Sequence, residues 1–139
     1  MATGRLAWEE LMATVRASLP QPVAEDIAAD RSLVMTGGDP GEVIVRLTRS
    51  AVTVFEFAVR RQGAHNSIVR PIRLGGFRWR RMPASRAISL LEQFIRTAQE
   101  SRRSKYALCR MCEELKPPER MHEEDVCQGC AGTHLGVVF

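Results

Sequence analysis

The chain has 139 residues, of which 45% are apolar and 26% are charged, and its formal net charge is +4. These values predict one compact soluble domain with a small appendage, large enough to sustain its own hydrophobic core. No run of about 18 apolar residues occurs, and Glu9 and Glu10 interrupt the N-terminal stretch where a signal peptide would be apolar. The sequence therefore predicts a cytoplasmic protein that neither spans nor binds a membrane.

The charge is segregated along the chain. Residues 1–41 have a net charge of −3, residues 42–110 of +11 and residues 111–139 of −4. Eighteen of the twenty basic residues are arginine, whose guanidinium forms paired hydrogen bonds with phosphate or carboxylate and stacks on flat rings. The cationic middle therefore indicates an anionic partner, either nucleic acid or an acidic protein surface. The alternative is that a GC-rich genome encodes Arg in place of Lys and that the acidic ends fold back onto this block.

The first element expected is an amphipathic helix over residues 5–19. Its apolar residues recur at spacings of three and four, which places them on one helical face: Trp8, Leu11, Met12, Val15 and Leu19. Pro20 and Pro22 end this helix, and Pro22 stands near the first position of a short second helix expected over Val23–Ala29.

The pattern then changes to the alternation typical of strands. Ser32–Thr36 and Glu42–Thr48 predict a hairpin, because Gly37–Gly41 between them is rich in turn residues. Ala51–Arg61 predicts a longer strand with Phe55, Phe57 and Val59 on the face directed toward the core, and Gln62–Asn66 predicts the next turn.

A second hairpin is expected from Ile68–Leu74 to Phe77–Arg81. Gly75 and Gly76 between these segments favour a two-residue turn, because glycine readily adopts the positive φ angles that such a turn requires. Pro71 cannot donate a hydrogen bond to a neighbouring strand, which indicates an edge position or a bulge.

A third helix is expected from Ser85, a candidate N-cap, to a point between Gln99 and Arg103. Its apolar stripe would pack on the sheet and comprises Ile88, Leu91, Phe94, Ile95 and Ala98. Basic residues at its end suit the negative pole of the helix dipole: Arg102, Arg103 and Lys105.

Together these elements predict an α+β fold over residues 1–105. We expect an antiparallel meander of four or five strands, packed by the N-terminal and C-terminal helices, followed by a small zinc module over residues 106–139. Strand alternation would direct arginines away from the core onto one face of the sheet, namely Arg46, Arg60, Arg73, Arg78 and Arg80. These five are the predicted nucleic-acid contacts, with Arg70, Arg81 and Trp79 as further candidates, although Trp79 alternates with Phe77 and therefore favours the core. The alternative is an ordinary half-solvated sheet with polar residues outward.

Four cysteines in the last 31 residues form the clearest motif in the sequence. Cys109, Cys112, Cys127 and Cys130 form two Cys-x-x-Cys pairs separated by fourteen residues. Each pair can direct both sulfurs at one ion, and the intervening loop can return the second pair to complete a tetrahedron, so the spacing predicts structural zinc. Disulfides, iron and thioredoxin-type redox chemistry are the alternatives. His134 and His122 lie near enough in the sequence to be substitute ligands.

The segment from Cys109 through Lys116 and Pro117 to Cys130 resembles the zinc-binding part of phage recombination endonuclease VII-like proteins and related treble-clef fingers. The resemblance covers about 25 residues and implies metal binding by the four cysteines. Glu113 replaces the usual glycine of the knuckle, and Met121 replaces the usual aromatic residue. Only nine residues follow Cys130, so the nuclease's catalytic element is not expected. If the second pair instead led into a strand over Leu135–Phe139, the module would be a zinc ribbon.

No constellation of catalytic residues is recognisable in the sequence, since it lacks a nucleophile elbow, a phosphate-binding Gly-rich loop with Lys, and a His-Glu-x-x-His motif. We therefore expect a non-catalytic zinc-binding protein that binds nucleic acid or another polyanion through its arginines. An adaptor that binds proteins through the zinc module and the arginines is the alternative, followed by a relative of the phage nuclease. A homo-oligomer has no support in the sequence.

Overall fold

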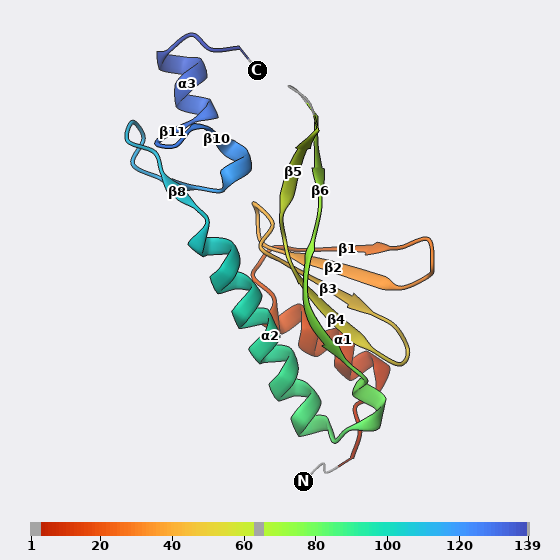
Figure 1. Cartoon of the computed structure of the whole chain (residues 1–139). Helices are drawn as coiled ribbons and strands as arrows, with labels where there is room; N and C mark the ends of the chain where they lie inside the picture. The colour runs from red at the N-terminus through yellow and green to blue at the C-terminus, as the bar shows by residue number, and fades with distance from the viewer. Residues whose placement is uncertain (1–3, 63–65, 139) are drawn as a thin grey trace.

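A five-stranded antiparallel sheet forms the body of the protein in the computed structural model, which describes residues 4–62 and 66–138. Its strands lie in the order β1-β2-β3-β4-β7 (Figure 1). Their bounds are Val23–Ile27 for β1, Leu33–Gly37 for β2, Val43–Leu47 for β3, Val52–Glu56 for β4 and Ile72–Phe77 for β7. β1, β2 and β3 each pair with the strand that follows in the chain. β4 also pairs with β7, although a further hairpin is inserted between them in the sequence. The predicted α+β class is confirmed.

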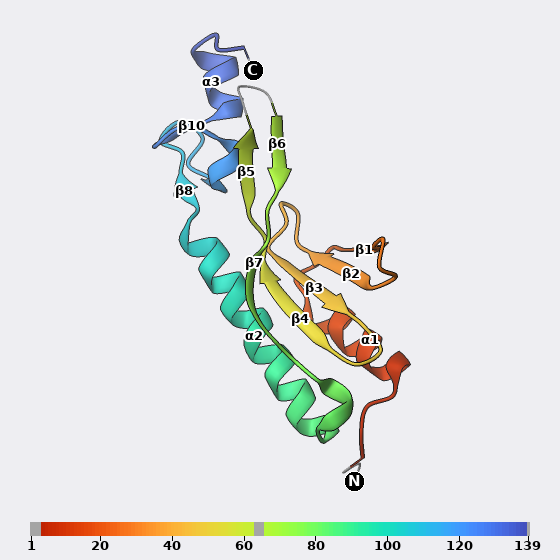
Figure 2. The same cartoon turned by 45° about the vertical axis from the view of Figure 1, so that its right-hand side comes forward.

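Two helices cover one face of this sheet, as Figures 1 and 2 show. They are α1 (Trp8–Ser18) and α2 (Ala84–Ser104). The hydrophobic core between helices and sheet includes Leu11 and Val15 of α1, Leu91 and Ile95 of α2, and alternate residues of the strands such as Val45. The predicted N-terminal helix is confirmed, and it ends before the proline pair as expected.

The segment after Pro22 is a strand, so the short helix expected over Val23–Ala29 is wrong. Residues 23–27 form β1, which pairs residue by residue with β2 from Val23↔Gly37 to Ile27↔Leu33. A five-residue segment gains little from helical propensity alone, whereas pairing with an existing strand satisfies its backbone groups. Arg31, with φ of 69°, completes the turn between the two strands.

The strand expected over Ala51–Arg61 is divided, and the predicted orientation of its first half is wrong. β4 ends at Glu56, and cross-strand pairing of Val54 with Val45 directs Val54 and Glu56 toward the helices. Phe55 therefore lies on the opposite, outer face of the sheet. The valines of β4, and not the predicted aromatic side chains, fill the space beneath the helices.

Gly75 and Gly76 form no turn; both lie inside β7, opposite Val54 and Thr53 of β4. A Cβ atom on Gly75 would lie 2.9 Å from the Phe94 ring of α2, and one on Gly76 would lie 2.6 Å from the Val52 carbonyl oxygen. The two glycines therefore permit close packing of β7 against its neighbours. The chain then leaves the sheet in a 3₁₀ turn, η1 (Trp79–Arg81), where a strand was expected.

The inserted hairpin consists of β5 (Val59–Gln62) and β6 (Asn66–Val69), which form their own two-stranded sheet. It prolongs the β4–β7 pair beyond the body and reaches toward the C-terminal module (Figure 1). Residues 63–65 of the turn predicted at its tip lie outside the described residues. The N-cap of α2 is Pro83 rather than the predicted Ser85, which lies within the first turn.

The C-terminal module contains two short hairpins and a helix. One hairpin joins β8 (Ala107–Leu108) to β9 (Leu115–Lys116), and the other joins β10 (Met121–Glu123) to β11 (Val126–Cys127). Between them lies the 3₁₀ turn η2 (Pro118–Arg120), and the final helix is α3 (Gln128–His134). In the part of the chain that the structure describes, no helix is both long enough and apolar enough to cross a bilayer.

Candidate metal centre and basic surfaces

The first cysteine pair lies in the loop that joins β8 to β9. The Cys109 N–H donates to the Glu114 carbonyl oxygen at 3.0 Å, and the Glu113 N–H donates to the Cys109 carbonyl oxygen at 2.9 Å. Glu113 has a φ of 61°, in the left-handed region. This region of φ favours glycine, and the knuckle turn forms here in spite of the glutamate.

The second pair lies where β11 leads into α3. Cys127 is the N-cap of the helix and Cys130 lies in its first turn, with the Cys130 N–H 3.5 Å from the Cys127 Sγ atom. Because this pair leads into a helix, and no strand occurs over residues 135–138, the zinc-ribbon alternative is wrong. Phe139, the last residue of that expected strand, lies outside the described residues.

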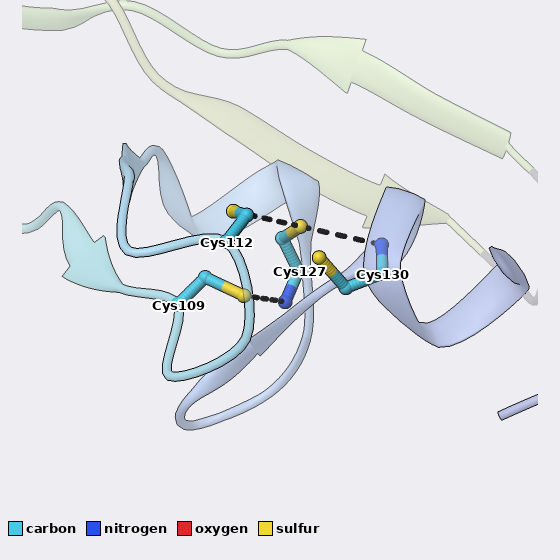
Figure 3. Close-up of side chains that lie close together, drawn as sticks. All are labelled: Cys109, Cys112, Cys127 and Cys130. Carbon is cyan, nitrogen blue, oxygen red and sulfur yellow. Dashed lines mark hydrogen bonds between the residues drawn. The ribbon is translucent and has the colours of Figure 1, made fainter. Parts of the chain in front are cut away.

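The four sulfur atoms converge on one point, as Figure 3 shows. All of them lie within 4.8 Å of one another, and the Cys112 and Cys127 Sγ atoms are 3.9 Å apart. Zn–S bonds of about 2.3 Å in a tetrahedron place sulfurs about 3.8 Å apart, so the cluster has the size of a four-thiolate zinc site. No disulfide joins the four cysteines. The predicted convergence of Cys109, Cys112, Cys127 and Cys130 is confirmed.

The surroundings of the thiols differ across the cluster. Backbone N–H groups of Cys112 and Cys127 lower the pKa of Cys109 to about 6, because they donate hydrogen bonds to its thiolate. Burial, followed by the neighbouring sulfurs, raises the pKa of Cys130 to about 12. Cys109 therefore ionises readily to a thiolate, while Cys130 keeps its proton unless a cation replaces it.

Neither histidine considered as a substitute ligand belongs to the cluster found among the described residues. His134 lies exposed in the last turn of α3. His122 lies on β10, with its Nε2 atom 3.9 Å from Glu123. The ligand set that the structure assembles is therefore four cysteines.

A buried arginine joins the cysteine module to the body. Arg102 of α2, 2% exposed, donates through Nε to the Gly41 carbonyl oxygen at 3.0 Å. Its two terminal nitrogens donate to the Glu119 carboxylate at 2.9 and 2.5 Å, and Glu119 belongs to η2 of the module. The guanidinium carbon lies 5.2 Å from the centres of the Phe57 and Tyr106 rings. Sequence reasoning assigned Arg102 only to the helix dipole, because no pattern in the sequence links it to Glu119.

The five arginines predicted to share one sheet face occupy three places. Arg46 and Arg73 lie on the outer face, next to Phe55, which pairs with Arg73 and has Arg46 6.0 Å from its ring centre. Arg60 lies on the β5–β6 hairpin. Arg78 and Arg80 lie at η1, outside the sheet. The single arginine face is therefore wrong, since the second predicted hairpin does not exist. The further candidates Arg70 and Arg81 lie after β6 and in η1.

Trp79 is buried, with 1% of its surface exposed, and its Nε1–H donates to the Thr48 carbonyl oxygen at 3.0 Å. The prediction that Trp79 belongs to the core is confirmed.

The two acidic residues within the arginine-rich stretch 42–86 both point inward. Glu56, 2% exposed, accepts hydrogen bonds from Lys105 Nζ at 2.6 Å and from Ser101 Oγ at 2.5 Å. Glu42 is buried and pairs with Arg103. The end of α2 thus neutralises both carboxylates, and neither shares the surface with the arginines.

The same stretch contains ten arginines and no lysine, and all ten arginines are exposed. They are Arg46, Arg49, Arg60, Arg61, Arg70, Arg73, Arg78, Arg80, Arg81 and Arg86. Within the described residues none of them forms an ion pair with a carboxylate. None of these ten side chains is therefore neutralised by an ion pair from the acidic ends of the chain, although Arg46 lies near Asp30. Elsewhere in the basic block the C-terminal acidic end does fold back, since Glu119 pairs with Arg102 and Asp125 with Arg110.

Comparison of the chain with protein-family models, with curated proteins and with solved structures finds no significant match.

Proposed function

We propose that this chain is a non-catalytic zinc-binding protein that binds nucleic acid through its exposed arginines. The observation that carries the proposal is the separation of charges within residues 42–86. Ten arginines face solvent and form no ion pair with a carboxylate among the described residues, while Glu42 and Glu56 are buried and neutralised. A surface of this kind attracts the phosphates of a nucleic acid and releases the counterions bound to them.

Zinc in this proposal has a structural role. Cys109, Cys112, Cys127 and Cys130 would hold the ion, and their succession of knuckle, hairpin and helix is that of a treble-clef finger. A shell of four thiolates leaves no open position for water, so the ion would hold the two hairpins and α3 together and would not activate a nucleophile. The module has few buried apolar residues of its own, mainly Val126 and Ala131, which supports a requirement for the metal.

Arginine suits phosphate contacts because its planar guanidinium donates paired hydrogen bonds to phosphate oxygens and keeps its charge at any physiological pH. Of the five arginines predicted from the sequence, Arg46 and Arg73 flank an aromatic ring on the open sheet face, while Arg78 and Arg80 lie at η1. The proposal therefore retains nucleic acid as the partner but distributes the contacts over more than one surface.

A protein adaptor is the second candidate, and one observation favours it. Large apolar side chains are exposed around the first knuckle: Leu108 is 55% exposed, Leu115 65% and Met111 36%. Neighbouring exposed apolar groups are typical of protein contact sites. In the adaptor, these side chains and the arginines would bind another protein.

A salt titration separates the two candidates. We would measure the fluorescence anisotropy of short labelled DNA and RNA of random sequence as full-length protein is added, at salt concentrations from about 50 to about 200 mM. The proposal predicts micromolar or tighter binding at the lowest salt, with affinity falling steeply as salt rises. Absence of binding at low salt would eliminate nucleic acid as the partner. Gel analysis of the same mixtures with Mg²⁺ tests catalysis, and cleavage that is lost in a metal-free sample would contradict the non-catalytic assignment.

A further inference from the structure

The exposed arginines are densest at one end of the body, where four segments of the chain meet. We infer that this end, called the arginine end and formed by Arg5, Arg49, Arg78, Arg80, Arg81 and Arg86, is the principal contact for the phosphate backbone of nucleic acid. The inference rests on the proposed function and assigns its site. Figure 2 shows the N-terminal segment, the β3–β4 turn, η1 and the start of α2 together, away from the cysteine module.

Specific contacts hold these segments together. Arg5 donates from a terminal nitrogen to the Arg80 carbonyl oxygen at 2.8 Å, and the Ala84 N–H donates to the Gly4 carbonyl oxygen at 2.9 Å. Residues 4 and 5 are thereby fixed beside both η1 and the first turn of α2. Three arginines distant in the sequence, Arg5, Arg80 and Arg86, are thus brought to one end of the molecule.

Two tryptophans provide a rigid support for the arginine end. The rings of Trp8 and Trp79 lie 6.3 Å apart, and the indole of buried Trp79 is anchored to the β3–β4 turn at Thr48. Arg49 lies over Trp8 at 4.4 Å, and Arg80 lies 5.4 Å from the Trp79 ring centre. A guanidinium held on a ring loses less conformational freedom when it binds phosphate, which favours this end over flexible surface arginines.

The acidic groups of this end do not neutralise its arginines. Glu9 and Glu10 lie in the first turn of α1, where they offset the helix dipole, and Glu10 accepts a hydrogen bond from the Ala7 N–H at 3.2 Å. The first turn of α2 contains no acidic residue and includes Arg86. A cation at this helix end is unfavourable for the fold, so the stability of α2 does not account for Arg86.

The rest of the basic block does not combine clustered arginines, supporting aromatic rings and the absence of acidic partners among the described residues. At the other end of α2, about 30 Å away for a helix of this length, Arg102, Arg103 and Lys105 pair with carboxylates. On the outer sheet face, Arg46 has the acidic neighbour Asp30. Hydrogen bonds from Ser32 lower the pKa of Asp30 most, and the positive charge of Arg46 lowers it further. The arginine end has the most cations, and none of its six arginines forms an ion pair with a carboxylate among the described residues.

Two matched triple variants test the inference. Arg78→Gln, Arg81→Gln and Arg86→Gln remove three cations of the arginine end whose side chains form no hydrogen bond, ion pair or ring contact within the described residues. Arg60→Gln, Arg61→Gln and Arg70→Gln remove three exposed cations from the β5–β6 hairpin and the residue that follows it. Thermal unfolding of both variants, which we expect to match wild type, shows that neither is misfolded.

The readout is binding of a short random-sequence DNA duplex to each full-length protein across salt concentrations. We expect the arginine-end variant to lose at least about tenfold in affinity at about 0.1 M salt and to reduce the slope of log affinity against log salt by roughly one for each contact removed. The hairpin variant should change the slope by less than about one. Equal losses in the two variants, or a larger loss in the hairpin variant, would overturn the inference while leaving the proposed function intact.

Failure of the proposed function has a different signature. If wild-type protein does not bind the duplex at low salt, both the function and this site assignment fail. If wild-type protein binds a poly-glutamate chain but not the duplex, the partner is an acidic protein, and the assignment of this end to nucleic acid is overturned.

Discussion

Replacing Arg102 by methionine should destabilise the protein strongly, because its guanidinium joins α2, the loop at Gly41 and η2 of the cysteine module. Methionine retains most of the apolar volume against Phe57 and Tyr106 but removes the charge and every donated hydrogen bond. The Glu119 carboxylate, with 15% of its side chain exposed, then loses its bidentate partner.

The magnitude follows from this burial. Removing one member of a buried ion pair costs about 3–5 kcal/mol, since the remaining charge stays desolvated. Burial alone would lower the pKa of Arg102, but the hydrogen bonds and charge of Glu119 outweigh it and raise the pKa, so the pair favours the folded state. Because Glu119 retains some contact with water, we expect about 3 kcal/mol, equivalent to roughly 10 °C in Tm.

Urea and thermal unfolding monitored by tryptophan fluorescence would measure this loss, because Trp8 and Trp79 both lie in the body. Arg96→Met is the matched control, since Arg96 is an exposed arginine of the same helix, and it should change the stability by less than about 0.5 kcal/mol. If Arg102→Met were no more destabilising than Arg96→Met, the reasoning that this junction stabilises the fold would be refuted.

Three further outcomes are expected. Gly75→Ala should cost about 1–3 kcal/mol in chemical denaturation, because its Cβ would meet Phe94 at 2.9 Å, whereas Gly4→Ala has no atom within 4 Å and should be neutral; equal effects would contradict the packing described. Chelation of zinc should unfold α3 and its hairpins, seen as lost helical circular dichroism with unchanged tryptophan emission; retention of the full spectrum would exclude a structural metal. The hydrogen bond from Arg16 lowers the pKa of Glu25, so their pairing should add stability above the ordinary pKa of a glutamate and lose it as the pH falls through the lowered value. Glu25→Gln should therefore reduce stability at neutral pH and converge on wild type in acid, and a difference that persists in acid would refute this.

The sequence predicts the parts of the structure that depend on local spacing. Two residues between thiols let both sulfurs of a pair point at one ion, whether the pair lies in a hairpin loop or at the start of a helix, and α1 follows from apolar spacing between clear ends. The burial of Trp79 was also predicted, but its cause is not strand alternation: Trp79 lies in η1, where its indole N–H donates to the Thr48 carbonyl oxygen.

The parts that depend on non-local pairing were predicted less well. A Gly-Gly pair is expected both in a tight turn and in a strand that packs closely against a large ring. Gly75 and Gly76 belong to the second case because of Phe94, which is distant in the sequence and cannot be recognised as their neighbour from local spacing. Glu56 is polar, yet it faces inward because Lys105 and Ser101 neutralise it there. The face on which a strand residue lies depends on which strands pair and in which register. Because the second predicted hairpin does not form, the predicted single arginine face does not form either.

Zinc and phosphorus analysis of full-length protein purified at low salt tests both halves of the account in one measurement. The account predicts one zinc ion per chain together with a molar excess of phosphorus from bound nucleic acid. A high-salt wash should remove the phosphorus and leave the zinc, because electrostatic contacts weaken with salt whereas four thiolates do not release the ion. Protein that contains no zinc, or that carries no phosphorus at low salt, would contradict it.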